Sequence, residues 1–156
     1  MLVESILRRL QPLPRFVYVK VVWSDARCRA FHVHVRPRRG CKGICSGCGK
    51  KRPGYDVLST RSFSFVPLWG IPVNLLYAMR RVDCFRCGVT VEMVPWATGK
   101  AMATHAFIWF LASWAKVLSW RETAKRFGTS WDTVFRCVSH AVQWGLAHRI
   151  QRGTTA

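Results

Sequence analysis

The stretch Cys45-Ser46-Gly47-Cys48-Gly49 is repeated in pattern, after a gap, by Cys84-Phe85-Arg86-Cys87-Gly88. Two residues between cysteines let one tight turn direct both sulfurs at the same point, and the following glycine can take the left-handed conformation that closes the turn. Two such turns supply four sulfurs, which is the closed tetrahedral ligand set of a structural zinc ion. The gap between the motifs is longer than the commonest four-cysteine spacing but fits two strands and a turn. The sequence therefore predicts one structural zinc ion, held by Cys45, Cys48, Cys84 and Cys87.

Disulfide bonds or a redox-active pair are the alternative interpretations of these cysteines. The chain opens on Met1-Leu2-Val3-Glu4, which lacks the basic start and apolar segment of a secretory signal. A cytosolic chain does not usually keep disulfides, and a redox motif is not expected twice with the same glycine. Cys41 remains a competing ligand, whereas Cys28 and Cys137 lie among apolar residues and are expected to be small core side chains.

The composition is that of a folded and strongly basic protein. Half of the 156 residues are apolar and 13% are aromatic, which excludes a disordered chain. The 25 Lys and Arg residues against 7 Asp and Glu residues give a net charge of +18. Because such a charge attracts polyanions, nucleic acid is the predicted partner, with a ribosome or an anionic membrane surface as alternatives. The helix-turn-helix pattern described below makes double-stranded DNA the predicted nucleic acid. The most apolar stretch, residues 106–115, is about half the ~20 residues that span a bilayer, so no membrane segment is expected.

Hydrophobic patterning predicts an α+β protein, with a small antiparallel zinc ribbon that follows an N-terminal β-hairpin and precedes a helix-turn-helix segment. Residues 1–40 are expected to hold a helix at 4–10 and the hairpin strands at 16–23 and 30–35. Residues 41–97 are expected to form the four-cysteine ribbon, with strands at 62–69, 73–82 and 90–94. His32 and His34 alternate with apolar residues, so we interpret them as solvent- or phosphate-facing rather than metal ligands.

From Thr104 the apolar period changes from two residues to about 3.6, which predicts a helical domain over residues 104–150. Its first helix is apolar on all sides between residues 107 and 118 and is expected to be buried or to meet a partner. Ser119-Trp120-Arg121-Glu122 has the capping-box pattern, so a short helix is predicted to residue 127. Ser130 is expected to cap a second helix over 131–146, and the turn at Gly128 completes a helix-turn-helix pattern, although any two short helices joined by glycine look similar.

In a helix-turn-helix the first turns of the second helix enter the major groove, where Ser130, Thr133 and Arg136 are the predicted base-reading residues. Arg136 is best suited to a guanine, and the alternative is an ordinary exposed arginine. The inner face of that helix is expected to carry Val134, Val138, Ala141, Val142 and Gly145. Contacts to phosphates add affinity without choosing a sequence. They are predicted for Arg38, Arg39, Lys50, Lys51, Arg52, Arg121, Lys125 and Arg126.

The order of these motifs resembles the N-terminal half of the ISL-three family of bacterial insertion-sequence transposases. The resemblance covers nearly the whole chain and is carried by the first cysteine motif with its basic linker, by the stretch from Arg80 to Gly88, by Glu92-Met93-Val94-Pro95-Trp96-Ala97 and by the helix-turn-helix pattern. It implies a zinc-binding and helix-turn-helix region that recognises the terminal inverted repeats of the element during DNA transposition. It also implies a bacterial cytoplasmic location, in association with the nucleoid.

In that family a catalytic domain follows, with three acidic residues that hold divalent metal ions for strand cleavage and transfer. Two-metal phosphoryl chemistry needs carboxylates that converge within a few ångströms. The acids of this chain are scattered: Glu4, Asp25, Asp56, Asp83, Glu92, Glu122 and Asp132. We therefore expect no enzymatic activity from this chain alone. It is expected to be a truncated transposase or one piece of a split gene, with a separate catalytic domain or a full-length transposase as a further partner.

Three other functions fit parts of the sequence. A stand-alone regulator or inhibitor of transposition needs the same DNA contacts, so the sequence does not separate it from the first interpretation. An RNA- or ribosome-associated zinc ribbon is disfavoured by the helix-turn-helix pattern and would prefer duplex RNA. An intact enzyme using its own acids or cysteines is disfavoured by the closed four-cysteine site and by the scattered carboxylates.

Overall fold

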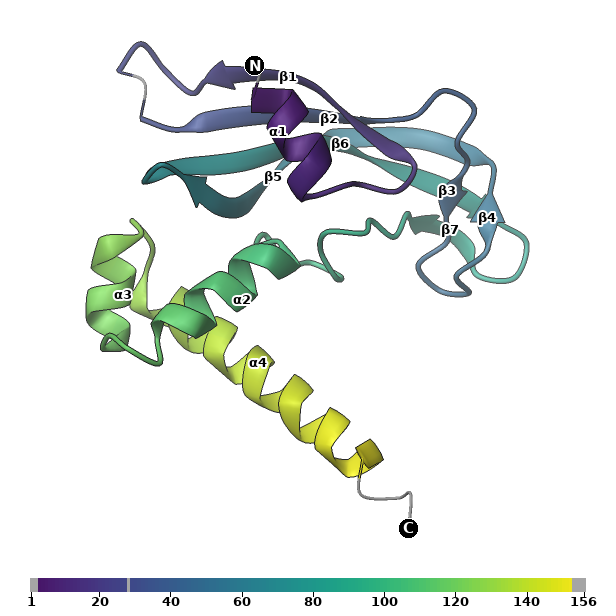
Figure 1. The fold of residues 1–156 in the computed structure, drawn as a ribbon. Helices are drawn as coiled ribbons and strands as arrows, with labels where there is room; N and C mark the ends of the chain where they lie inside the picture. Colours follow the sequence, from purple (N-terminus) through teal and green to yellow (C-terminus); the bar gives the residue numbers. More distant parts are fainter. Residues whose placement is uncertain (1–2, 28, 153–156) are drawn as a thin grey trace.

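The computed structural model describes residues 3–27 and 29–152, with side chains up to residue 148. Cys28, expected to be a core residue, lies outside the described residues. A β-sheet precedes three consecutive helices (Figure 1), which confirms the α+β class. In the described part of the chain, no helix combines the length and the apolar character needed to cross a membrane. The elements are α1 (Val3–Leu10), β1 (Phe16–Trp23), β2 (Phe31–Pro37), β3 (Gly43–Ile44), β4 (Lys51–Arg52), β5 (Gly54–Leu68), β6 (Ile71–Cys84), β7 (Gly88–Val91), α2 (His105–Trp114), α3 (Trp120–Arg126) and α4 (Trp131–Arg152).

The main sheet has five strands, and its centre is β6. β1 and β2 form the expected antiparallel hairpin, but β2 then lies parallel to residues 73–76 of β6. β5 is antiparallel along one edge of β6, and β2 and β7 share the other edge. The sheet is therefore mixed rather than wholly antiparallel, and it contains strands from both the 1–40 and 41–97 segments. β3 and β4 form a separate two-stranded sheet.

The pair β5–β6 is longer than its sequence pattern indicates. β5 begins at Gly54, although the pattern predicts a start at residue 62. Residues 54–60 are all exposed, so no alternation of buried and exposed positions marks them as a strand. They are extended because they pair with β6, with Asp56 opposite Arg81 and Thr60 opposite Ala78. Pairing, rather than burial, therefore defines this half of the strand.

The core of the sheet contains aromatic side chains from strands that are far apart in the sequence. Trp96, from the segment after β7, meets Phe16, Tyr77 and Phe63 edge-on, with ring centroids 4.9, 5.4 and 6.0 Å apart. Val33 and Val35 are buried in this core, as the alternation in the second strand predicts. The stretch Pro95-Trp96-Ala97 thus ends the sheet by covering its core.

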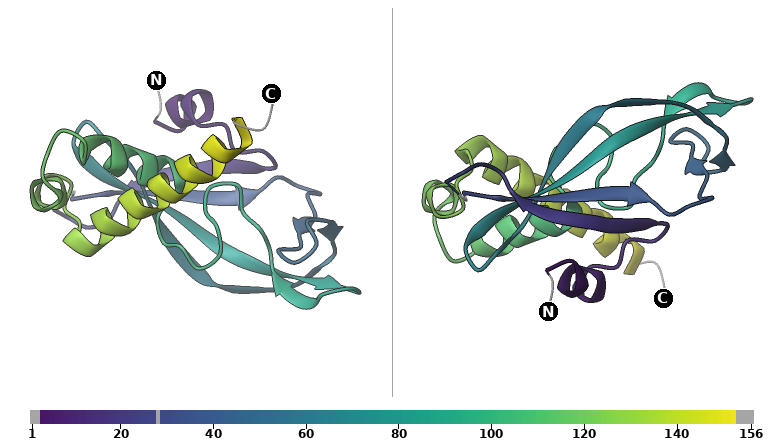
Figure 2. Two further views of the ribbon diagram at one scale, coloured as in Figure 1. Left: turned by 90° about the horizontal axis from the view of Figure 1, so that it is seen from below. Right: turned by 90° about the horizontal axis from the view of Figure 1, so that it is seen from above.

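A second apolar core lies between α2, α3 and α4, where Phe107, Leu111, Val134 and the predicted core residue Cys137 are buried. α2 ends at Trp114 rather than near residue 118: Ala115 is its C-cap, and residues 115–118 form a turn that leads to Ser119, which is the N-cap of α3 and has an extended backbone with ψ of 155°. Seen from below, α4 runs obliquely across the sheet (Figure 2), and in Figure 1 it projects away from it.

The projection of α4 corrects one expectation about its inner face. Val134 is fully buried, but Val142, expected on the same face, is 53% exposed. α4 extends past α2 and α3, and the described contact of its second half with α2 is partial: the Trp144 ring meets the Trp109 ring edge-on with centroids 5.2 Å apart, which leaves Val142 half-exposed. The helix also continues to Arg152, beyond the predicted end near residue 146.

The two cores are joined through the loop that precedes α2. The Thr104 hydroxyl donates to the carbonyl of Ser64 in β5 at 2.9 Å, and the Ser64 N–H donates to the carbonyl of Met102 at 2.8 Å. The N–H of His105 donates to the carbonyl of Trp96 at 2.8 Å. These bonds attach the start of α2 to the sheet and so position the three helices relative to it.

Candidate metal centre and basic surfaces

Four cysteine sulfurs meet at one end of the sheet. Cys45 and Cys48 lie in the turn between β3 and β4, and Cys84 and Cys87 lie at the turn between β6 and β7. All four sulfurs are within 4.8 Å of one another, and Cys41 is not part of the group. The glycine after each motif has the expected positive φ, 67° at residue 49 and 71° at residue 88. The group can hold one metal ion with four sulfur ligands.

Two side chains donate to the sulfurs or lie against them. The Thr90 hydroxyl is 3.3 Å from Cys45 Sγ, and Arg52 Nε donates to Cys84 Sγ at 3.2 Å. Arg52 Nη2 also lies 3.9 Å from Cys48 Sγ. Arg52 is predicted from the sequence to contact phosphate, but its guanidinium is directed at the sulfurs, where it offsets the negative charge of thiolates. Its position on β4, beside the end of β6, is visible only in the folded chain.

The crowding of the sulfurs separates the pKa values of the thiols. The hydrogen bond with Thr90, together with the N–H of Cys48, lowers the pKa of Cys45 to about 6. Loss of hydration and the neighbouring Cys45 sulfur raise the pKa of Cys87 to about 12. Sulfurs this close do not all ionise unless a cation joins them, so the group could hold a metal ion that offsets part of the thiolate charge.

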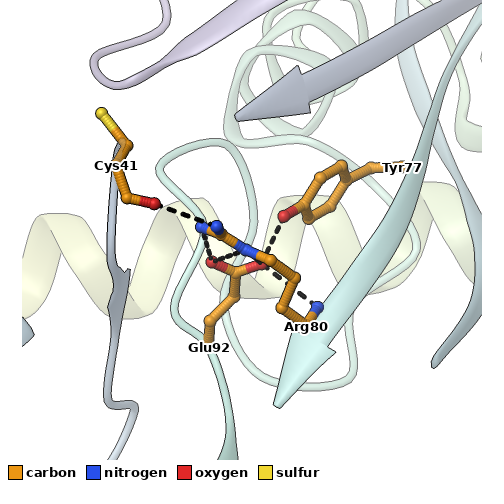
Figure 3. Close-up of polar contacts among 4 residues, drawn as sticks. All are labelled: Cys41, Tyr77, Arg80 and Glu92. Atoms are coloured by element: carbon orange, nitrogen blue, oxygen red, sulfur yellow. Dashed lines mark hydrogen bonds and ion pairs between the residues drawn. The ribbon is translucent and has the colours of Figure 1, made fainter. Parts of the chain in front are cut away.

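A buried ion pair lies next to the sulfurs, between β6 and the residue that follows β7 (Figure 3). The Glu92 side chain is 1% exposed and accepts from Arg80 Nη2 at 2.7 Å and from Arg80 Nε at 3.0 and 3.1 Å. The Tyr77 hydroxyl donates to the same carboxylate, and Arg80 Nη1 donates to the carbonyl of Cys41 at 3.0 Å. Burial, followed by this bond to the carboxylate, raises the pKa of Tyr77.

Glu92 also attaches the first cysteine motif to the sheet. Its backbone forms an isolated β-bridge with Cys45, and the Met93 N–H donates to the carbonyl of Ile44 at 2.8 Å. A methyl group on Gly43 would lie 2.5 Å from Val82 and 3.2 Å from the Glu92 carboxylate, so glycine is required for this approach. In the sequence Glu92 counts only as one of the scattered acids, because no sequence signal shows that its neighbour is Arg80.

The basic residues predicted to contact DNA near the cysteines have different surroundings. Lys50, Lys51 and Arg39 are exposed. Arg38 is also exposed, and its Nε donates to the carbonyl of Phe16 at 3.4 Å. Arg81 forms a bidentate pair with Asp56, with Nε 2.7 Å from Oδ1. Exposed cations therefore surround the first cysteine motif, whereas Arg81 on β6 is held by Asp56.

The predicted caps of α3 and α4 are present. Ser119 and Glu122 form both bonds of the capping box, and the Thr133 N–H donates to Ser130 Oγ at 3.1 Å. The Ser130 and Thr133 hydroxyls are 2.8 Å apart, so the two predicted base-reading hydroxyls bond each other. Arg136 is 77% exposed, with Nη2 2.7 Å from Asp132. Three predicted phosphate contacts are exposed on α3, namely Arg121, Lys125 and Arg126.

Sequence reasoning missed two exposed aromatic residues at the start of α4. Trp131 and Phe135 are 52% and 41% exposed, and their rings stack with centroids 5.7 Å apart. Their spacing of four residues places them on one helix face and would have identified the pair. In Figure 1 this region and the sulfur cluster lie at opposite ends of the molecule, so the two predicted groups of DNA contacts are not brought together.

Comparison with known proteins finds sequence similarity between this chain and a transposase. Two curated relatives, each a transposase for insertion sequence element IS1557 from a strain of Mycobacterium tuberculosis, are 34% identical to the chain over 105 residues. The match covers 64% of this chain and 23% of each relative. The chain thus spans about a quarter of the length of these relatives, of which it is a partial homologue. No family model and no solved structure matches the chain.

Proposed function

We propose that this chain is the DNA-binding, N-terminal part of an insertion-sequence transposase and recognises the terminal inverted repeats of its element. The similarity to a transposase carries the proposal, since an enzyme that moves a DNA element must bind its ends. The net charge of +18 and the exposed cations at both ends of the molecule support a DNA ligand.

In this proposal the four sulfurs hold one zinc ion, and residues 41–97 act as a zinc ribbon. Zinc fits four sulfur donors in a closed site better than the oxygen-preferring ions do, and such a site leaves no position for water or substrate. The role is structural: the ion would link the β3–β4 turn to the β6–β7 turn. The hydrogen bonds from Thr90 and Arg52 would stabilise the bound thiolates.

The helices α3 and α4 are proposed to act as a helix-turn-helix. Gly128, with φ of 61°, lies in the short turn between them, and Ala124 and Val134 pack in their common core. In this unit Arg136 would read a base from the first turns of α4, while Arg121, Lys125 and Arg126 would contact phosphates.

We propose further that strand cleavage and transfer need a catalytic domain outside this chain. Most of its carboxylates have a local partner that would compete with a metal ion. Glu92, Asp56, Asp25 and Asp132 pair with arginines, Glu122 caps α3, and Glu4 accepts from the N–H of Val21 at 3.1 Å. The second candidate function is a stand-alone regulator of transposition, which the same DNA contacts would serve.

The test measures zinc content and DNA binding on one purified sample. We expect about one zinc ion per chain and duplex binding that weakens steeply between two salt concentrations, as contacts to phosphates require. Zinc without DNA binding would overturn the proposal, and a preference for duplex RNA would favour the ribosome- or RNA-associated alternative. Magnesium- or manganese-dependent cleavage that is lost on changing one acid would overturn the assignment as a non-catalytic part.

The role of Arg136 is tested on a duplex selected from a random library. Arg136→Ala is expected to weaken binding to the selected duplex by about 1–3 kcal/mol and to leave binding to random duplex nearly unchanged. Arg121→Ala is the control, since loss of a phosphate contact weakens binding to both duplexes equally. An equal loss for Arg136→Ala would make Arg136 a phosphate contact instead.

A further inference from the structure

Phe85 stands exposed at the tip of the second cysteine motif, between two of the clustered sulfurs. Its side chain is 82% exposed, the highest value among the large apolar side chains of the described residues. The cysteines on either side belong to the sulfur group, and Gly88 closes the turn with φ of 71°. The backbone that presents the ring is therefore constrained, although the ring itself packs into neither core.

One face of this ring is already covered by a cation. The guanidinium carbon of Arg52 lies 4.2 Å from the ring centroid, and the same guanidinium is held by the sulfurs of Cys84 and Cys48. The high exposure of Phe85 shows that the rest of the ring is open to solvent. Phe85 is thus an aromatic platform: the Arg52 guanidinium holds one face of its ring, and the rest of the ring is free to contact a ligand.

The surroundings of the platform are cationic and aromatic. Arg86 follows Phe85 in the chain, and the exposed Lys50 and Lys51 lie at β4, next to Arg52. On the neighbouring strand Tyr55 is 60% exposed, with the Arg81 guanidinium 5.3 Å from its ring. Surfaces that bind single-stranded nucleic acid combine these two features, because cations contact the backbone and aromatic rings stack on bases.

A fully paired duplex offers no free base face on which an exposed aromatic ring can stack, because its bases are already stacked on one another. We propose that Phe85 stacks on an unpaired base of DNA, so that this end of the molecule prefers duplex with a single-stranded segment. The inference rests on the proposed DNA-binding function for the nature of the polyanion. It uses, however, a residue and a surface that duplex recognition by α3 and α4 does not need.

The test compares two DNA probes at one salt concentration: a blunt duplex, and the same duplex with a single-stranded overhang that carries 2-aminopurine. We expect the wild-type chain to bind the overhang probe more tightly and to quench 2-aminopurine by stacking. Phe85→Ala should weaken binding to the overhang probe about tenfold and abolish the quenching, while binding to the blunt duplex is unchanged. Phe85→Trp, which keeps an aromatic ring, should retain both the tighter binding of the overhang probe and the quenching of 2-aminopurine.

Trp69→Ala is the matched control, because Trp69 is 72% exposed in the turn between β5 and β6, at the opposite end of the same strands. It should leave the overhang preference intact. Zinc content checks the fold of each variant, and Phe85→Leu, which keeps the apolar volume but lacks the ring, replaces Phe85→Ala if that variant loses zinc. Equal binding of both probes by the wild-type chain, or equal loss on both in the Phe85 variants, overturns the inference.

The two proposals fail in different ways. If the chain binds the blunt duplex but Phe85 variants behave as wild type, base stacking is wrong and the DNA-binding function stands. If the chain binds only the overhang probe, through Phe85, the stacking inference stands and duplex recognition is wrong. A stronger Phe85-dependent signal on an RNA overhang overturns the choice of DNA.

Discussion

Two arginines that are adjacent in the sequence have different roles because their partners are buried to different extents. Arg81 pairs with Asp56 on the surface, where both side chains are about two-fifths exposed, at 38% and 41%. Arg80 pairs with Glu92, whose side chain is 1% exposed. Exposed pairs contribute little to stability, whereas a buried charge that loses its partner is costly. Only the second pair is therefore expected to matter for folding.

Glu92→Gln tests the buried pair. The amide has nearly the same shape but leaves the Arg80 guanidinium without a counter-charge, so we expect the free energy of unfolding to fall by about 3 kcal/mol. Urea unfolding in the presence of zinc measures the change. Asp56→Asn, which breaks the exposed pair with Arg81, is the control and should cost less than about 1 kcal/mol. Similar losses in the two variants would show that burial does not distinguish the pairs.

At the scale of elements, α3 is too short to be stable by itself. It has seven residues, and isolated helices shorter than about 12 residues are marginal in water. Its stability must come from packing on α4 and from its caps. Ser119 Oγ accepts from the Glu122 N–H at 3.2 Å, and the Glu122 carboxylate accepts from the Ser119 N–H at 3.0 Å.

Ser119→Ala is therefore expected to lower the free energy of unfolding by about 1 kcal/mol. Ser113→Ala is the matched control: the Ser113 hydroxyl donates to the carbonyl of Trp109 within α2 at 2.8 Å, and alanine is a better helix former. That control should be neutral or slightly stabilising in the same thermal or urea experiment. If both serine variants are equally stable, the capping box does not contribute to the stability of α3.

At the scale of the whole molecule, the sulfur group joins two turns whose apolar contact, among the described residues, is limited to one small cluster. The small cluster around it contains Val82 and the cysteines themselves, whereas the large cores lie in the sheet and between the helices. A metal ion would therefore supply most of the stability at this end of the molecule. Its removal should affect β3, β4 and β7 more than α2, α3 and α4.

Cys45→Ser should abolish stoichiometric zinc binding and lower the thermal stability of the chain, because three sulfurs no longer close the site. Cys41→Ser is the control, since Cys41 lies outside the group and should leave about one zinc ion bound. Metal analysis after dialysis and a thermal melt distinguish the variants. Retention of zinc by Cys45→Ser together with its loss from Cys41→Ser would make Cys41 a ligand.

Zinc binding should release more protons as the pH falls. The pKa of Cys45, at about 6, lies below its ordinary value of 9.0, so its thiolate stabilises the metal-free fold fully above about pH 9 and loses that effect progressively as the pH falls from there through about 6. At about pH 7.5 this thiol has no proton to release, and at about pH 5.5 it releases up to one. Calorimetry in two buffers with different ionisation enthalpies measures the difference. Equal proton release at both pH values would contradict the lowered pKa of Cys45.

Local patterns in the sequence determined much of this protein. The Cys-x-x-Cys-Gly spacing brings two sulfurs to each turn, the Ser119 and Ser130 caps begin α3 and α4, and the alternation at Val33 and Val35 selects the buried face of β2. Each of these features depends on residues a few positions apart, so short-range geometry suffices to predict it.

Tertiary structure alone decided which distant residues became partners. The parallel pairing of β2 with β6, the burial of Glu92 against Arg80 and the hydrogen bond of Arg52 to a cysteine sulfur all join residues at least 12 positions apart in the sequence. The exposure of Phe85 and of Val142 likewise depends on which elements reach them. Side-chain environment is set by packing between elements, and no local periodicity encodes which element will lie alongside.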